Sequence, residues 1–112
     1  MSKHAAIESA EDRLFRALAA PIRRAILDAL RDGPLTTGAL CDRFGRIDRC
    51  TVMQHMKVLE GAGLLVAERR GRERLNHLNA LPIRDLYARW VAPYAQEAVE
   101  RLAALRDGLE GR

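Results

Sequence analysis

At 112 residues, with 48% hydrophobic residues, 30% charged residues and a net charge of +4, the chain fits one globular domain. No apolar run approaches the roughly 20 residues that cross a membrane, and the N-terminal MSKHAAIESAEDR lacks the apolar core of a signal peptide. Two cysteines are too few for a secreted disulfide framework, so we expect a cytoplasmic protein with no membrane partner.

Residues 1–44 predict three helices. The first covers residues 7–18, and its partial apolar stripe consists of Ile7, Leu14, Phe15 and Leu18. Pro21 lies where the first turn of a second helix accepts proline, and Gly33-Pro34 ends that helix. The outer face of this second helix includes Arg23. The third helix is short and runs from Thr37 to Phe44, with Thr36-Thr37 as the candidate cap and with Leu40 and Phe44 as its buried residues.

The segment from Asp48 to Ala62, DRCTVMQHMKVLEGA, predicts an amphipathic helix. Its apolar face consists of Val52, Met56 and Leu59, and Asp48 is a good N-cap. The other face carries Thr51, Gln54 and Lys57, with His55 at its edge. Glutamine bonds an adenine edge at two points, and the threonine methyl contacts a thymine methyl. The segment therefore resembles a DNA-reading helix, although an ordinary helix with a solvated face has the same spacing.

The segment from Leu64 to Leu78, LLVAERRGRERLNHL, predicts a β-hairpin. Two strand-like runs, Leu65–Ala67 and Leu75–Leu78, flank a short connection that contains Gly71. Arginines crowded at such a tip favour an anionic partner. The arginines at or beside this tip are Arg69, Arg70, Arg72 and Arg74. A short helix, a turn, a second helix with a polar face and a basic hairpin predict a winged helix-turn-helix. The fold class is thus mainly α-helical with a small β-hairpin wing.

The excess positive charge lies on this predicted surface. Residues 43–74 hold eight Arg or Lys and four Asp or Glu, while the remaining residues hold eleven of each sign. Such concentration is the electrostatic footprint of a duplex-binding surface. A winged helix that binds only other proteins, the alternative of a different class, should have a neutral or acidic wing.

The last third of the chain predicts one long helix from Leu81-Pro82 to about Leu109, which Pro93 should kink or interrupt. Its apolar stripe is too long to bury against so small a domain, so a second copy of the chain is the expected partner. Packing back on the same domain is the alternative. We expect residues 1–112 to form one domain, with a DNA-binding core at about 14–78 and dimerisation helices at 1–20 and 81–110. The expected interface residues are Ile7, Leu14, Leu18, Leu86, Tyr87, Trp90, Tyr94, Leu102 and Leu105.

Three segments in this order resemble the ArsR-type winged-helix transcriptional regulators: ALAAPIRRAILDAL, GPLTTGAL and CTVMQHMKVLEGAGLLVAERRGRERLNHL. The family pattern L-x-x-P-x-R-x-x-I-L-x-x-L matches Leu18 to Leu30, and T-V-x-x-H-L-x-x-L matches Thr51 to Leu59 with Met56 in the Leu place. The wing pattern matches Gly63 to Arg72. The resemblance implies a homodimeric repressor that binds a palindromic operator in double-stranded DNA. The family also dimerises through its terminal helices.

On this basis, Thr51 and Gln54 are expected to read bases, with Arg49 and Cys50 at the groove edge. Phosphate contacts are expected from the start of the third helix, the following turn, the reading helix and the wing. His55 is either a phosphate donor or a packing partner of the preceding helix. The full expected set is Thr36, Thr37, Arg46, Arg49, Cys50, Thr51, Gln54, His55, Lys57, Arg69, Arg70, Arg72 and Arg74.

Many ArsR-type proteins release DNA on binding a metal or metalloid, commonly at a Cys-x-Cys pair on the helix before the reading helix. Here that helix reads ALCDRF, with Cys41 alone, and the last helix lacks the histidines of the family's other site. We therefore expect no metal and no cofactor, and the effector is unknown. A thiol-redox or metal(loid)-responsive repressor that uses Cys41 and Cys50 is the alternative to a buried Cys41 and an inert Cys50. Because no nucleophile motif, phosphate-binding glycine loop or carboxylate pair is evident, we expect no enzyme.

Overall fold

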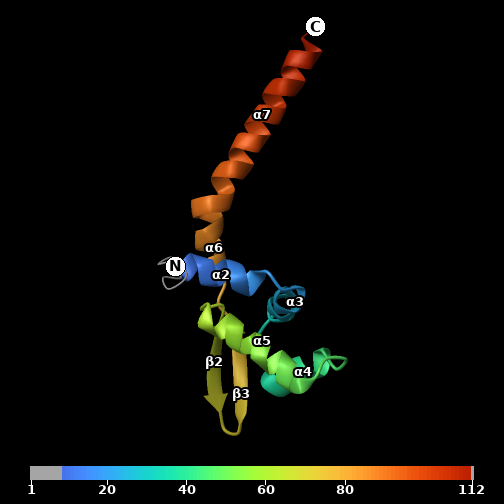
Figure 1. Ribbon diagram of the computed structural model, residues 1–112, viewed down its shortest axis with the longest axis vertical. Coiled ribbons are helices and arrows are strands. Elements are labelled where there is room, and N and C mark those ends of the chain that lie inside the picture. Colours follow the sequence, from blue (N-terminus) through green and yellow to red (C-terminus); the bar gives the residue numbers. More distant parts are fainter. Residues whose placement is uncertain (1–8, 112) are drawn as a thin grey trace, which may run out of the picture. The chain divides into compact units, whose positions relative to one another are not determined.

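The computed structural model describes residues 9–111, which fall into two compact units that divide after Pro82. Figure 1 shows the helices of the first unit as α2 (Ala10–Leu18), α3 (Pro21–Ala29), α4 (Thr37–Arg43) and α5 (Arg49–Gly61). The second unit consists of the end of α6 (Leu81–Leu86), a π-helical turn η1 (Tyr87–Val91) and α7 (Ala92–Glu110). Ile7, predicted to lie in the first helix and at a dimer interface, is outside the described residues.

Side chains cap three helices of the first unit, and α2 begins at Ala10, later than the predicted start at residue 7. The Ser9 hydroxyl accepts a hydrogen bond from the Asp12 amide, and the Asp12 carboxylate accepts one from the Ser9 amide, which makes a capping box for α2. The Thr36 hydroxyl caps α4, and the Asp48 carboxylate caps α5 by accepting from the Thr51 amide at 3.3 Å. Pro21 occupies the first turn of α3. The predicted caps at Thr36 and Asp48 are therefore confirmed.

The sheet has one strand more than the sequence predicts. It is antiparallel with the order β1-β3-β2, formed by β1 (Leu35–Thr36), β2 (Leu65–Arg70) and β3 (Glu73–Leu78). The two-residue strand β1 pairs Leu35 with Asn76 and was missed because so short a run has no periodicity. The hairpin strands also extend further toward the tip than predicted, since Arg70 pairs with Glu73.

The hairpin tip is a two-residue turn, which explains the longer strands. Gly71 has a φ of 62°, whereas no described non-glycine residue has a positive φ. A positive φ at the first central position alone is the pattern of a type II′ turn, which suits the twist of paired strands. The tip therefore consists of Gly71 and Arg72, and the other three arginines predicted to crowd there lie in the strands.

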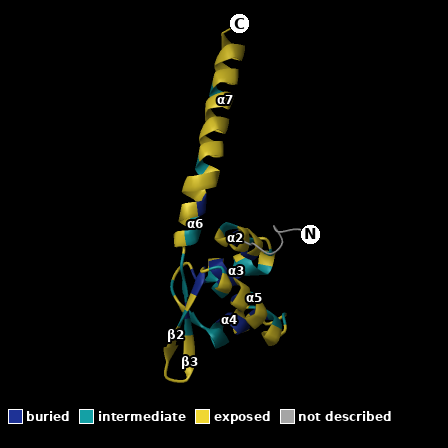
Figure 2. Cartoon of the chain, turned by 60° about the vertical axis from the view of Figure 1, so that its left-hand side comes forward, coloured by how far each residue is buried: buried dark blue, intermediate teal, exposed yellow. Residues whose placement is uncertain are grey.

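The core of the first unit forms where α2, α3 and α5 meet and where α4 and α5 contact the sheet. Its fully buried side chains include Ile26, Leu40, Val52, Leu59 and Leu64. Figure 2 shows the buried residues in these helices and strands. Phe44, predicted as a core residue, is only half-buried at the C-cap of α4. Leu14, predicted at a dimer interface, is instead 4% exposed in this core, because it lies on the face of α2 that packs on α3 and α5.

The second unit is helical throughout but not uniformly α-helical. Pro93 lies in the first turn of α7, directly after the π-helical turn η1. Proline has no N–H and its ring collides with the carbonyl four residues earlier, so a widened turn accommodates it without a break. The interruption predicted at Pro93 is thus present as a change of helix type. In residues 9–111, no helix is both long enough and apolar enough to span a membrane.

Candidate nucleic-acid interface

Helix α5 separates its side chains as the sequence predicts. Val52, Met56 and Leu59 are buried, while Gln54 and Lys57 are exposed. Thr51 is half-buried in the first turn, where its amide bonds the Asp48 cap. The polar face therefore carries an amide, an ammonium and a threonine methyl at helical spacing, the groups that contact base edges and phosphates in a major groove.

Both threonines at the start of α4 make internal hydrogen bonds. The Thr36 hydroxyl accepts from the Ala39 amide at 3.1 Å, and the Thr37 hydroxyl accepts from Asn76 Nδ2 at 3.1 Å. In each case the hydroxyl acts as an acceptor, so its own hydrogen is still available to a phosphate oxygen. The two internal bonds fix where these donors lie. Arg46 and Arg49, in the turn and at the first position of α5, are exposed.

His55 has a partner inside the first unit, and this partner lies on α3 rather than on α4, the helix that precedes α5. Arg23 Nη1 lies 3.0 Å from His55 Nδ1, and the same guanidinium donates to the carbonyls of Arg16 and Ala17, both at 2.8 Å. Because guanidinium groups only donate, Nδ1 is the acceptor. Arg23 thereby connects the end of α2 to α5. The sequence places Arg23 on the outer face of its helix, and the structure places it half-buried between elements.

The hairpin register sorts the wing arginines onto two faces. Side chains alternate across a sheet, so Leu65, Ala67 and Arg69 share a face with their cross-strand partners Leu78, Asn76 and Arg74. This face includes the buried Leu65 and Asn76, so it is the face turned toward the core. Arg70 and Glu68 lie on the opposite face. The four arginines that look equivalent in sequence therefore have different surroundings.

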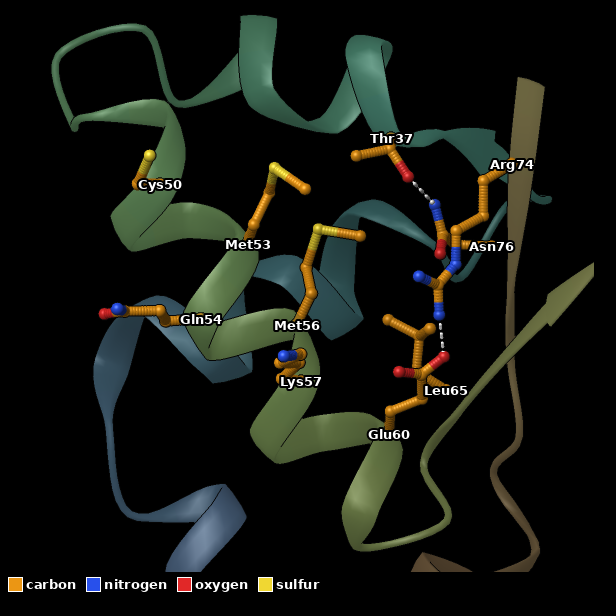
Figure 3. A pocket seen from close by; sticks show the side chains of 10 residues that line it. All are labelled: Thr37, Cys50, Met53, Gln54, Met56, Lys57, Glu60, Leu65, Arg74 and Asn76. Carbon is orange, nitrogen blue, oxygen red and sulfur yellow. Dashed lines mark hydrogen bonds and ion pairs between the residues drawn. The ribbon is translucent and has the colours of Figure 1, made fainter. Parts of the chain in front are cut away.

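Two of the wing arginines already have anionic partners. Arg74 Nη2 donates to Glu60 Oε2 near the end of α5, an ion pair that Figure 3 shows between the wing and the helix. Arg70 Nε lies 3.4 Å from Glu68 Oε2. Among residues 9–111, no ion pair involves Arg69 or Arg72. These two arginines are the wing groups best placed to meet an external anion.

Glu68 is the centre of a small charged group on the outer face of the wing. His77 Nε2 lies 2.9 Å from Glu68 Oε1 across the strands. This hydrogen bond, together with Arg70, holds the pKa of the Glu68 carboxyl below its ordinary value. Arg70 is thus partly neutralised within the wing. The sequence gives no signal for this pairing, because His77 and Glu68 are nine positions apart and meet only through the register.

The two cysteines have different environments. Cys41 is 6% exposed in the core, as expected for a small hydrophobic residue, and Cys50 is exposed in the first turn of α5. Neither is in a disulfide. Within the described part of the chain, no three His, Cys, Asp or Glu side chains gather in a way that could hold a metal ion. A thiol-redox switch made of these two cysteines would therefore have to join a buried thiol to an exposed one.

Comparison with known proteins identifies relatives of one kind. A family described as "Helix-turn-helix domain" matches residues 18–68. The regulator YuzN of Bacillus subtilis, named as an uncharacterized HTH-type transcriptional regulator, is 34% identical over 87 residues, which cover 72% of this chain and 95% of YuzN. The HTH-type transcriptional repressor SmtB of Mycobacterium tuberculosis is 42% identical over 72 residues, which cover 64% of this chain. This chain spans about half of the length of SmtB, 53%.

The solved structures agree with these relatives. A crystal structure titled as an ArsR family transcriptional regulator has a TM-score of 0.71 to this chain and 33% sequence identity, and the match covers 82% of this chain and 98% of the other. A possible transcriptional regulator for arsenical resistance has a TM-score of 0.64 and 30% identity, with 80% of this chain and 92% of the other covered. The family match to residues 18–68 contains α3, α4 and α5, and so includes the two helices, α4 and α5, that carry part of the candidate interface.

Proposed function

Because the chain belongs to the ArsR family of helix-turn-helix transcriptional regulators, we propose that it binds a specific sequence of double-stranded DNA and represses transcription there. The observation that carries the proposal is the exposed face of α5, where Gln54 and Lys57 have no hydrogen-bond or ionic partner among residues 9–111. The wing arginines Arg69 and Arg72 likewise have no ion pair within these residues. This combination provides base-reading groups and phosphate-binding groups on neighbouring elements.

The surroundings of each residue support a division of roles. Gln54 and Thr51 read bases, with Arg49 and Cys50 at the edge of the groove. Phosphate contacts come from the donors for which the described part of the chain offers no anionic partner, which are Thr36, Thr37, Arg46, Lys57, Arg69 and Arg72. Arg74 acts as a positioning residue, because its pair with Glu60 fixes the wing against α5. His55 positions α5 from the other side through Arg23.

A homodimer is the arrangement we propose for the complete regulator. Large apolar side chains follow helical spacing along η1 and α7, and each has between 47% and 66% of its surface exposed. These side chains are Tyr87, Trp90, Tyr94, Val99, Leu102 and Leu105. Trp90 and Tyr94 already contact each other with ring centroids 5.2 Å apart. A continuous apolar stripe of this size is typical of a protein interface, and a second copy of α7 complements it. Two-fold symmetry then predicts a palindromic operator.

The test is selection of bound duplexes from a random pool, followed by affinity measurements on the enriched sequence. We expect an inverted repeat to be enriched and to bind about 10³-fold or more tightly than random DNA. The affinity should fall steeply with salt, because phosphate contacts release counterions. Equal affinity for all sequences would contradict base reading. Failure to retain DNA at low salt would instead favour a protein-interaction module.

A further inference from the structure

The first unit contains a cavity of about 280 Å³ between α5 and the elements that face it. One wall consists of α5 side chains, among them Met53 and Met56, and the opposite wall includes Thr37 at the start of α4 and Asn76 on β3. Figure 3 shows the side chains of Met53 and Met56 pointing toward this opposite wall. Met53 is 44% exposed, whereas Met56 and Asn76 are buried. The cavity therefore opens to solvent on one side and reaches the core on the other.

Asn76 brings an unpartnered acceptor to the wall of this cavity. The residue is fully buried, and its Nδ2 donates to the Leu35 carbonyl at 3.2 Å and to the Thr37 hydroxyl at 3.1 Å. Because a carbonyl oxygen only accepts, the group that faces Leu35 is the NH₂, and this fixes the orientation of the amide. Among residues 9–111, no donor meets Asn76 Oδ1. A buried acceptor without a partner costs stability, and a donor from outside the chain would recover it.

The size and the lining of the cavity favour a small aromatic molecule. An apolar cavity of about 150 Å³ holds benzene, so the present volume of about 280 Å³ accommodates up to two fused rings. Thioether sulfur makes favourable contacts with aromatic rings, and Met53 and Met56 provide two such groups on one wall. Leu65, which is 2% exposed, adds apolar surface to the lining.

The charged residues of the lining disfavour a cationic ligand. They are Lys57, Glu60 and Arg74, and the last two pair with each other. Lys57 makes no ion pair in the described part of the chain, so the lining keeps one uncompensated positive charge. An ammonium group in the cavity would meet this like charge. The donor that Asn76 lacks should therefore belong to a neutral hydroxyl or ring N–H group.

We propose that this cavity binds a neutral aromatic molecule of one or two rings that donates a hydrogen bond to Asn76 Oδ1, such as a phenol or an N–H heterocycle. The rings lie against Met53 and Met56. The proposal concerns the chain alone and goes beyond DNA binding, so it does not rest on the proposed function. The alternative is that Oδ1 is satisfied by a trapped water molecule, or by Arg74 after it leaves Glu60. Neither alternative gives the cavity a preference for an aromatic donor.

The first experiment compares indole with benzofuran, which has the same shape and no N–H donor. Binding to the full chain is followed by NMR of methyl-labelled methionine, because an aromatic ring shifts the methyl signals of Met53 and Met56. We expect saturable shifts with a dissociation constant of about 0.1 to about 1 mM for indole. Benzofuran should bind about tenfold more weakly, because it leaves the acceptor unpaired. Equal affinities would overturn the role of Asn76, and absence of saturable shifts with indole would overturn the site.

A second pair of probes tests the preference for an aromatic ring. Phenol and cyclohexanol both carry a hydroxyl on a six-membered ring, but only phenol has a π face for the thioethers of Met53 and Met56. We expect phenol to bind more tightly in a competition against indole. Cyclohexanol that competes equally well would contradict the proposed ligand class.

A pair of variants tests whether the ligand lies in the cavity. Met53→Trp places a bulky side chain at the opening and should abolish saturable binding of indole. The matched control is Val58→Trp, because Val58 is 39% exposed on the same helix and lies outside the residues that line the cavity. Circular dichroism and thermal melting establish that both variants fold, and Val58→Trp should retain the affinity of the wild type. Undiminished binding by Met53→Trp, or an equal loss in both variants, would place the ligand elsewhere and overturn the proposal.

Discussion

The wing arginines allow a quantitative test, because only some of them have partners inside the protein. Arg72 lies at the hairpin tip and makes no ion pair with any residue from 9 to 111, whereas Arg74 is held by Glu60. Removing a phosphate contact should lower the salt slope by about 0.9 per site, or about 1.8 in the proposed dimer. Arg72→Ala should therefore reduce the affinity lost between about 50 and about 200 mM salt by about tenfold.

Arg74→Ala should behave differently, because it removes a charge that already has a partner. An exposed or half-exposed ion pair contributes about 0.2–1 kcal/mol, so we expect a small loss of stability and a smaller change in the salt slope than for Arg72→Ala. Glu60→Gln is the matched control. It frees the Arg74 guanidinium, and DNA of any sequence should then bind more tightly with a steeper slope.

Gln54→Ala completes the set, because Gln54 is assigned to bases rather than to phosphates. Loss of a bidentate base contact should reduce discrimination between operator and random DNA by about 1–3 kcal/mol and leave the salt slope nearly unchanged. The assay is fluorescence anisotropy of labelled operator and random duplexes across a salt series. An unchanged slope for Arg72→Ala would refute the placement of the tip on the DNA backbone. An equal loss on both duplexes for Gln54→Ala would refute base reading by that residue.

Three further outcomes follow from other parts of the molecule. Trp90→Asp places a charge in the proposed interface and should give monomers with weak DNA affinity, whereas a wild type that sediments as a monomer at micromolar concentration would contradict the dimer. Leu59→Ala empties a fully buried site and should cost about 2–5 kcal/mol in urea unfolding. His77→Ala removes the main cause of the lowered pKa of Glu68, so an NMR titration should find that pKa closer to its ordinary value. Because the folded-state pKa is lowered, the stabilisation by this pair is present above the ordinary carboxyl range and is lost as the pH falls through the folded pKa.

Local signals explain why α5 was predictable at almost residue precision. Its cap at Asp48 and its buried face at Val52, Met56 and Leu59 lie within one continuous segment, so spacing alone identifies both. The starts of α3 and α4 follow from local signals in the same way, from Pro21 in the first turn of α3 and from the Thr36 cap of α4. The exposed polar face of the helix α5 then follows by elimination from the buried one.

Interactions between distant segments explain what the sequence does not predict. Strand β1 has two residues and exists because it pairs with β3, about forty positions later. The fold likewise brings Glu60 close to Arg74 and His55 close to Arg23. These two arginines look like unpaired surface charges in the sequence, but in the structure each links two elements. The burial of Leu14 depends on α3 and α5 rather than on its own helix. The wing is thus recognisable from composition, while the role of each arginine requires the register.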